Sequence, residues 1–334
     1  MRIGIICPSE IAFRRFLPAL REAGCFEFAG VAIAAKEEFA GATDEVLEKE
    51  RAKAQSFIDG YGGKLFEGYR TLIESDEVDA VYLPLPPGLH YPWARKALAA
   101  GKHILVEKPC TTALKDTEDL LSLAQEKGLA VHENYMFTFH DQLGTIHDVV
   151  ASGEIGDVRL YRIAFGFPMR AQNDFRYNKN LGGGALLDCG GYTLKYASML
   201  LGPSAKILCA VSNGKEGFQV DMYGSATLVN HDGVTAQVAF GMDQNYKCEL
   251  EVWGSKGTVY TNRVLTAPAG FVPEMVIRKG NEEERRPLPA DDAFKKSILH
   301  FQSCIMQDGT RKENYASLLR QAELVEEFRR QAHL

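Results

Sequence analysis

The stretch "IICPSEIAFRRF" at residues 5–16 decides the fold of the first part of the chain. The apolar residues before it predict a strand at Arg2–Ile6, and the residues after it predict a helix at Ile11–Ala23. A strand, a tight turn and a helix in this order form the frame in which the glycines of G-x-G-x-x-G bind a dinucleotide. In this chain other residues occupy the three glycine positions: Cys7, Ser9 and Ala12.

The residues of this loop allow two interpretations. The first is that the loop still binds the pyrophosphate of a dinucleotide. Ser9 and Ala12 are small enough to allow the close approaches that the second and third glycines provide. The N–H groups of the first helical turn lack intrahelical partners and therefore attract an anion. The alternative is a strand, turn and helix that bind no ligand. The residues expected to meet a pyrophosphate at this loop are Cys7, Pro8, Ser9, Glu10 and Ile11.

The composition excludes several classes of protein. The 334 residues carry a net charge of −6 without a block of like charges, so nucleic-acid binding has no electrostatic support. Seven cysteines show no spacing typical of a metal site, which predicts reduced thiols, no bound metal and a cytoplasmic location. The sequence shows no signal peptide, and no apolar run approaches the roughly 20 residues that span a bilayer.

Strand and helix patterns alternate over residues 1–130. This alternation predicts parallel strands joined by right-handed helical crossovers, which is a doubly wound Rossmann sheet for binding a dinucleotide. The predicted strands are Arg2–Ile6, Phe28–Ala34, Ala80–Leu85, His103–Glu107 and Ala130–Glu133. The predicted helices are Ile11–Ala23, Glu45–Tyr61, Tyr69–Glu74, Tyr91–Ala100 and Asp116–Lys127.

Residues 131–334 predict a second domain for substrate binding and oligomerisation. Alternating apolar and polar residues predict a large, open and mostly antiparallel sheet, followed by a helix from about Asn314 to Gln331. One uncovered face of such a sheet is unfavourable in a monomer, so we expect it to pair with another copy. The predicted strands are Val158–Phe167, Lys206–Ser212, Ser225–Asn230, Val234–Met242, Lys247–Trp253 and Thr258–Asn262.

Several stretches in a fixed order resemble the Gfo/Idh/MocA oxidoreductases. Three carry the family resemblance: "GKHILVEKP" (101–109), "SGEIGDVR" (152–159) and "FRYNKNLGGGALLDCGGY" (175–192). Three more are most similar to its nucleotide-sugar 3-ketoreductases: "VDAVYLPLP" (78–86), "HENYMF" (132–137) and "GVTAQVAFGM" (233–242). The resemblance implies hydride transfer between NAD(P) and a sugar carbonyl or hydroxyl, best interpreted as reduction of a nucleotide-linked 3-keto-6-deoxyhexose. It also implies a homodimer or homotetramer.

Two other functions remain open at this point. The first is a free-aldose or trans-dihydrodiol dehydrogenase of the same family, which uses the same tyrosine and lysine. The second is a non-catalytic NADP-binding regulatory protein, which the missing loop glycines favour. The chain retains the residues that the resemblance assigns to catalysis, Lys108, Asp188 and Tyr192, and this favours an enzyme.

The expected chemistry is reduction of a ketone, which needs a hydride on carbon and a proton on oxygen. Lys108 follows a strand at its carboxyl end, where open α/β sheets bind ligands. A neighbouring ammonium lowers the pKa of a phenol, so Tyr192 as proton donor and Lys108 as its partner form a plausible couple. Asp188 lies four residues before Tyr192, on the same face of a helix, and is expected to bind a sugar hydroxyl or to orient the lysine.

The choice of cofactor depends on the end of the second strand. Ala35 and Lys36 occupy this tip and resemble the Ser-Arg pair of NADP-using relatives. A basic residue there favours the 2′-phosphate of NADP, whereas Glu37 in the same place would favour NAD. We therefore expect NADP, with NAD as the alternative. The resemblance implies further cofactor contacts from Leu85, Pro86, His90, Glu107, Lys108, Asn134 and Arg176.

Overall fold

The computed structural model describes residues 1–39 and 41–334, which form two compact units. The first unit comprises Met1–Asn134 and Phe294–Leu319, and the second comprises Tyr135–Ala293 and Arg320–Leu334. The sequence predicts a single boundary near residue 130 and therefore assigns all of the C-terminal part to the second domain. The segment Phe294–Leu319 instead belongs to the first unit. The helix at its start packs on the first sheet, with the Phe294 ring 6.2 Å from that of Phe16.

A parallel sheet with the strand order β3-β2-β1-β4-β5-β6 forms the centre of the first unit. This is the order of a doubly wound dinucleotide-binding fold, and it confirms the predicted Rossmann sheet. Its strands are β1 (Arg2–Ile6), β2 (Glu27–Ile33), β3 (Lys64–Glu67), β4 (Ala80–Leu83), β5 (His103–Val106) and β6 (Val131–Glu133). Its helices are α1 (Leu17–Ala23), α2 (Asp44–Tyr61), α3 (Tyr69–Glu74), α4 (His90–Ala99), α5 (Leu114–Lys127), α8 (Ala293–Met306) and the start of α9 (Asp308–Ala332).

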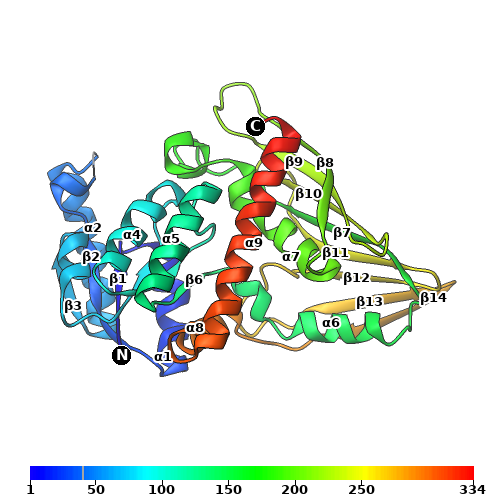
Figure 1. The fold of residues 1–334 in the computed structure, drawn as a ribbon, viewed down its shortest axis with the longest axis horizontal. Coiled ribbons are helices and arrows are strands. Elements are labelled where there is room, and N and C mark those ends of the chain that lie inside the picture. The colour runs from blue at the N-terminus through cyan, green and yellow to red at the C-terminus, as the bar shows by residue number, and fades with distance from the viewer. Residues whose placement is uncertain (40) are drawn as a thin grey trace. The chain divides into compact units, whose positions relative to one another are not determined.

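Helices cover both faces of this sheet. Successive residues of a strand point to opposite faces, so each strand places side chains under the helices on both sides. On one face, Val81 and Ile104 are buried in a cluster with residues of α4 and α5, which lie side by side (Figure 1). On the other face, the Tyr82 ring stacks on Phe16 with centroids 4.1 Å apart, and Phe294 of α8 joins the same aromatic group. The strands are therefore buried on both sides.

A second sheet, with the order β14-β13-β12-β11-β7-β10-β9-β8, forms the second unit. Strand β7 pairs in parallel with β10, and the other neighbouring strands pair antiparallel, which confirms the predicted mostly antiparallel sheet. Its strands are β7 (Val158–Gly166), β8 (Lys206–Asn213), β9 (Tyr223–Val229), β10 (Thr235–Gly241), β11 (Lys247–Gly254), β12 (Thr258–Asn262), β13 (Glu274–Lys279) and β14 (Glu282–Pro287). Its helices include α6 (Gln142–Ala151) and α7 (Gly191–Leu201).

In the described part of the chain, one face of the second sheet is covered and the other is exposed. Helix α7 packs across β7 and β10 (Figure 1). Side chains such as Ile163 and Val238 are buried on this face. The alternate residues of the same strands, such as Arg162 and Gln237, are exposed on the opposite face. The strand alternation in the sequence thus corresponds to one apolar and one polar face.

No helix in the described ranges 1–39 and 41–334 is long and apolar enough to cross a membrane.

Candidate active site

The loop after β1 keeps the backbone shape of a glycine loop although Cys7 replaces the first glycine. Cys7 has φ +78°, a conformation that glycine adopts freely and that L residues rarely adopt. Its N–H donates to the Ala32 carbonyl at 3.1 Å, and its thiol turns toward Tyr69 and Glu50. Burial, and then the Glu50 carboxylate, raise the pKa of the Cys7 thiol to about 12. The side chain of Cys7 therefore packs against its neighbours and is not a reactive thiolate.

The backbone at the start of the helix after this loop can be compared with what the predicted pyrophosphate contact requires. Ser9 caps this helix, because its Oγ accepts from the Ala12 N–H at 3.2 Å and its carbonyl accepts from the Phe13 N–H at 3.1 Å. The N–H groups of Glu10 and Ile11 precede these bonds and are the ones that a phosphate would meet. The site fits a dinucleotide pyrophosphate in this respect. The Glu10 side chain takes no part in the anion site and pairs with Arg14 on the surface.

The tip of β2 presents Lys36 at the predicted position, with the exposed Glu37 directly after it. Lys36 is exposed and pairs with Asp44 at 2.6 Å. Glu38, which no sequence motif marks as a site residue, accepts the N–H groups of Ala35, Tyr69 and Arg70 at 2.7 to 2.9 Å. That carboxylate holds the start of α3, and Glu37 is exposed. An exposed lysine at this tip fits the 2′-phosphate of NADP.

A buried carboxylate ties together the carboxyl ends of three neighbouring strands. Glu107, directly after β5, accepts from the Tyr82 hydroxyl of β4 at 2.6 Å and from Asn134 Nδ2, just after β6, at 2.7 Å. Burial raises the pKa of Glu107, although both donors oppose that rise. The backbone N–H of Lys108 also hydrogen-bonds to this carboxylate. The turn that carries Lys108 is therefore held at the ligand-binding edge of the sheet.

His90 connects the two loops that follow β4 and β5. Its Nδ1 lies 2.7 Å from the Pro109 carbonyl oxygen, and its Nε2 lies 2.7 Å from that of Leu85. The ring is fully buried, and this burial lowers its pKa to about 4. His90 thus supports the loop of Lys108 from within the first unit. Pro86 begins the next turn, where its carbonyl accepts from the Leu89 N–H at 2.9 Å.

Glycines allow the helix that carries Asp188 and Tyr192 to lie close to its surroundings. A Cβ on Gly190 would lie 2.9 Å from the Phe240 ring of β10, and one on Gly191 would lie 2.1 Å from the Tyr135 hydroxyl. Asp221 accepts the Leu186 N–H at 2.6 Å and so caps the start of the helix. The sequence "LLDCGGY" is therefore required for packing as well as for its polar residues.

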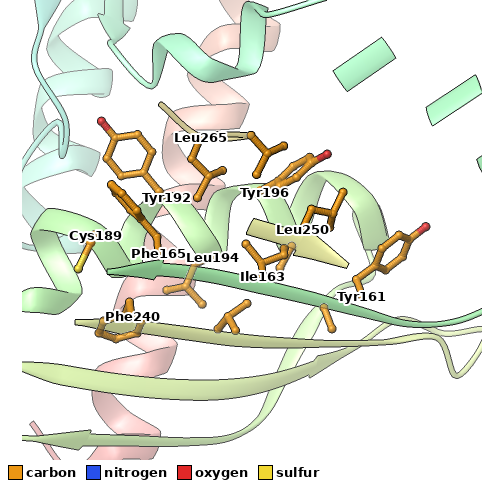
Figure 2. Close-up of a cluster of buried hydrophobic side chains, with 14 of the residues drawn as sticks. Tyr161, Ile163, Phe165, Cys189, Tyr192, Leu194, Tyr196, Phe240, Leu250 and Leu265 are labelled. Carbon is orange, nitrogen blue, oxygen red and sulfur yellow. The ribbon is translucent and has the colours of Figure 1, made fainter. Parts of the chain in front are cut away.

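Tyr192 is set in a cage of aromatic rings. Its ring centroid lies 5.0 Å from that of Tyr135, 5.7 Å from that of Phe137 and 5.2 Å from that of Phe165. Figure 2 shows the ring above the strands, with its hydroxyl at the end away from the sheet. The side chain is buried to all but 8%. The apolar cage fixes the ring and leaves the hydroxyl as its polar end.

Asp188 is tied to Arg176 rather than held alone. Arg176 Nε donates to Asp188 Oδ2 at 2.7 Å, and Nη1 donates to Asp174 Oδ1 at 3.1 Å. Burial lowers the Arg176 pKa, but the two carboxylates outweigh it and raise the pKa overall. The structure thus brings together two predicted site residues, one expected to contact the cofactor and the other expected to act in catalysis. Lys108 belongs to the first unit, whereas Arg176, Asp188 and Tyr192 belong to the second.

Three potential metal ligands in the first unit lie near one another, although the sequence predicts no metal site. The ligand atoms of His132, His300 and Cys304 lie within 4.8 Å of one another. Both ring nitrogens of His132, however, already meet hydrogen-bond partners, Asn314 Oδ1 at 3.1 Å and Ser297 Oγ at 2.9 Å. Burial also raises the pKa of the Cys304 thiol to about 12, which disfavours the thiolate that a metal needs. We assign no metal to this cluster.

Comparisons with known proteins cover nearly the whole chain. A family model described as an oxidoreductase family with an NAD-binding Rossmann fold matches residues 2–135, and a GFO/IDH/MocA C-terminal domain model matches residues 144–260. A dTDP-3,4-didehydro-2,6-dideoxy-alpha-D-glucose 3-reductase of Actinomadura kijaniata is 38% identical, over 98% of this chain and 95% of the relative. Its counterpart in Streptomyces violaceoruber is 40% identical, over 100% and 96%.

A solved structure of a 3-ketoreductase is also similar to this chain in its three-dimensional fold. The crystal structure of a 3-ketoreductase from Actinomadura kijaniata in complex with NADP and TDP-benzene matches with a TM-score of 0.91. The sequence identity is 38%, and the match covers 99% of this chain and 97% of that one. Further crystal structures of that ketoreductase carry a tyrosine-to-phenylalanine or a lysine-to-alanine replacement.

Proposed function

Because the chain belongs to the Gfo/Idh/MocA family of oxidoreductases, we propose that it is an NADP-dependent 3-ketoreductase acting on a dTDP-linked deoxysugar. The similarity to sugar 3-reductases along nearly the full length of both chains carries this proposal. The six-strand order of the Rossmann sheet and the anion site at Glu10 and Ile11 support the cofactor. The expected substrate is dTDP-3,4-didehydro-2,6-dideoxy-α-D-glucose or a close analogue.

Lys108 and Tyr192 are the residues that we assign to catalysis. The solved variants of the Actinomadura ketoreductase replace one lysine and one tyrosine. These two residues are as far apart in that sequence as Lys108 and Tyr192 are in this one. The aromatic cage around Tyr192 and the Glu107 carboxylate beside Lys108 support the assignment, because each fixes the side chain or its backbone. Placement within a fraction of an ångström is what efficient proton transfer requires.

In the proposed reaction, the carbonyl group of the sugar receives a proton from the protein and a hydride from the cofactor. Bound NADPH supplies the hydride to C3 of the sugar. Tyr192 gives its phenolic proton to the carbonyl oxygen, and the ammonium of Lys108 stabilises the phenolate that remains. Asp188, held by Arg176, is assigned to binding a sugar hydroxyl. Of the other predicted cofactor contacts, His90, Glu107 and Asn134 are buried and hold the loops from within. The contacts that we keep in the proposal come from the loops at the strand ends, namely Cys7, Pro8, Ser9, Glu10, Ile11, Ala35, Lys36, Leu85 and Pro86.

The direct test of the proposed function is turnover of the keto sugar. The purified protein is mixed with NADPH and dTDP-3,4-didehydro-2,6-dideoxy-α-D-glucose, and loss of nicotinamide absorbance is followed. We expect one NADPH to be oxidised for each sugar reduced. Binding of NADPH without any oxidation would instead favour the non-catalytic regulatory protein. Oxidation of free aldoses with NADP⁺, without turnover of the keto sugar, would favour the dehydrogenase.

Lys36 predicts a preference for NADPH over NADH. Its exposed pair with Asp44 is weak and readily exchanged for a phosphate contact, since surface ion pairs contribute about 0–1 kcal/mol. Lys36→Glu is expected to lower kcat/KM for NADPH roughly ten- to a hundredfold, the worth of a hydrogen bond to a charged group, and to change the NADH value little. Lys49→Glu on α2, an exposed lysine paired with Glu45, is the control. A wild-type preference for NADH would contradict the assignment.

We infer that the uncovered face of the second sheet binds a second copy of the chain. Small residues, Ala164 and Ala239, are neighbours in the middle of this face. Around them lie cations and anions in equal number, Arg162, Lys247, Glu249 and Glu251. These charges are already paired within the chain, Arg162 with Glu251 and Lys247 with Glu249, so a second copy can cover the face without leaving a charge unpaired.

Light scattering tests this assembly. We expect the wild-type protein to scatter as a dimer or tetramer of the 37.0 kDa chain. Ala239→Arg puts a large charge into the centre of the face and is expected to yield the monomer at micromolar concentration. Met306→Arg, on a helix of the first unit where the side chain is 70% exposed, is the control. A monomeric wild-type protein would contradict the inference.

We also propose a cytoplasmic location. All seven cysteines are free thiols in the described structure, and four of them are buried. Reduced, unpaired thiols are typical of a reducing compartment. Fractionation of the native host, with the protein recovered in the cytosolic fraction, is the measurement that checks it.

A further inference from the structure

A chain of buried hydrogen bonds connects helix α8 with the loop of Lys108. Asn134 Nδ2 donates to Glu107 Oε1 at 2.7 Å, and Ser297 Oγ of α8 donates to Asn134 Oδ1 at 2.8 Å. His132 Nε2 lies 2.9 Å from the same Ser297 oxygen. Ser297 has no exposed surface, and Asn134 and His132 expose 1% and 2%. In a site without solvent, each of these bonds is costly to lose.

The directions of the bonds follow from which atoms can donate. Asn134 must turn its NH2 group to the Glu107 carboxylate, so its oxygen faces Ser297 and receives the single hydroxyl proton. The Ser297 oxygen also lies 2.9 Å from His132 Nε2. Asn314 donates to the Val131 carbonyl at 2.5 Å, and its oxygen lies 3.1 Å from His132 Nδ1. The His132 ring is therefore held between Asn314 and Ser297, and the chain runs from this ring to the Glu107 carboxylate.

The chain ends on the backbone of Lys108. The Glu107 carboxylate hydrogen-bonds to the Lys108 N–H and to the Tyr82 hydroxyl. If Asn134 rotates, Glu107 loses one of its donors and the carboxylate is free to shift. That shift displaces the peptide that carries the lysine. The orientation of Lys108 is thus set in part by α8, although Ser297 follows Asn134 by 163 residues in the sequence.

We propose that Ser297 and His132 are positioning residues that act on the reaction through Asn134 and Glu107. This role rests on the proposed function of Lys108. Ser297 holds the amide of Asn134 in the one orientation that donates to Glu107. His132, fixed by Asn314, holds Ser297 in turn. Neither positioning residue touches the reacting atoms.

The test compares S297A with the wild-type protein in reduction of dTDP-3,4-didehydro-2,6-dideoxy-α-D-glucose by NADPH. We expect kcat to fall about tenfold, because a small displacement of a catalytic group acts on the transition state. The KM for the sugar is expected to change by less than about twofold. S303A makes the same substitution on the same helix, where the half-buried Ser303 donates to the Leu299 carbonyl, and should leave kcat unchanged. A wild-type kcat in S297A would overturn the proposal.

A double variant distinguishes positioning from a general loss of structure. If Ser297 acts through Asn134, then adding S297A to N134A causes no further fall in kcat. Losses that multiply would overturn the proposal. Should S297A fail to fold, S297C takes its place, because a thiol of similar size donates only weakly.

A crystal structure of the S297A protein gives a result that does not depend on activity. We expect the Asn134 amide to be rotated and the Glu107 carboxylate to be displaced. Unmoved side chains of both residues would overturn the positioning role. If the wild-type protein does not reduce the keto sugar, the proposed function fails, and this crystal structure still decides whether Ser297 positions Asn134.

Discussion

Tyr192→Phe is expected to lower kcat for the keto sugar by roughly 10²–10⁴-fold, the usual worth of a positioned general acid. Phenylalanine keeps the ring inside its cage of Tyr135, Phe137 and Phe165, so packing is preserved and only the donor is lost. The Kd of NADPH, measured from nicotinamide fluorescence, should therefore hardly change. This combination separates loss of a proton donor from loss of the fold.

The same helix offers a matched control. Tyr196 lies one turn after Tyr192, is buried to all but 2%, and has a hydroxyl without a hydrogen-bond partner in the described structure. Tyr196→Phe makes the identical chemical change and is expected to retain the wild-type kcat. A Tyr192→Phe protein with near-normal turnover would show that another group donates the proton.

Lys108→Met is expected to lower kcat roughly ten- to a hundredfold. The substitution keeps most of the side-chain length and removes the ammonium, whose hydrogen bond to a charged partner contributes about 1.5–3 kcal/mol. The Glu107 carboxylate loses a neighbouring cation but keeps its bonds to Tyr82 and Asn134, so the sheet edge should stay folded. Steady-state kinetics with saturating NADPH measure the effect.

Lys115→Met provides the control for this change, since Lys115 is exposed in the first turn of α5. It removes one positive charge from the same unit and is expected to leave kcat unaltered. If the Lys108 variant retained kcat within about threefold of the wild-type value, its loss of transition-state stabilisation would be under about 1 kcal/mol, and Lys108 would not be a partner of the proton donor.

The fold was predictable wherever burial imposes a pattern on the residues. Strands β1 and β4 are continuous apolar runs because both faces are covered, and the sequence predicts them within two residues at each end. Strand β3 has one buried residue, Phe66, so its four residues carry no such pattern. Strand β14 lies at a sheet edge and is mostly exposed, held by pairing with β13 and by ion pairs such as Arg285 with Glu274. Edge strands of this kind escape periodicity.

The candidate site was predictable where a residue follows a recognisable local motif. Lys108 and Tyr192 belong to such motifs and remain the proposed catalytic pair. The interactions of these motifs with distant parts of the chain were not readable. Glu38 has no local signal for holding the start of α3, and Ser297 meets Asn134 only through the packing of α8 on the sheet. Pairings between residues far apart in the sequence need the fold itself.

The measurement that tests the central claim most directly is the fate of a labelled hydride. The protein is incubated with NADPH that carries deuterium at the transferable position of nicotinamide C4 and with dTDP-3,4-didehydro-2,6-dideoxy-α-D-glucose, and the product is examined by NMR. An NADP-dependent 3-ketoreductase puts one deuterium on C3 of the sugar. Deuterium at another carbon, or an unchanged sugar with NADPH bound, would contradict the account.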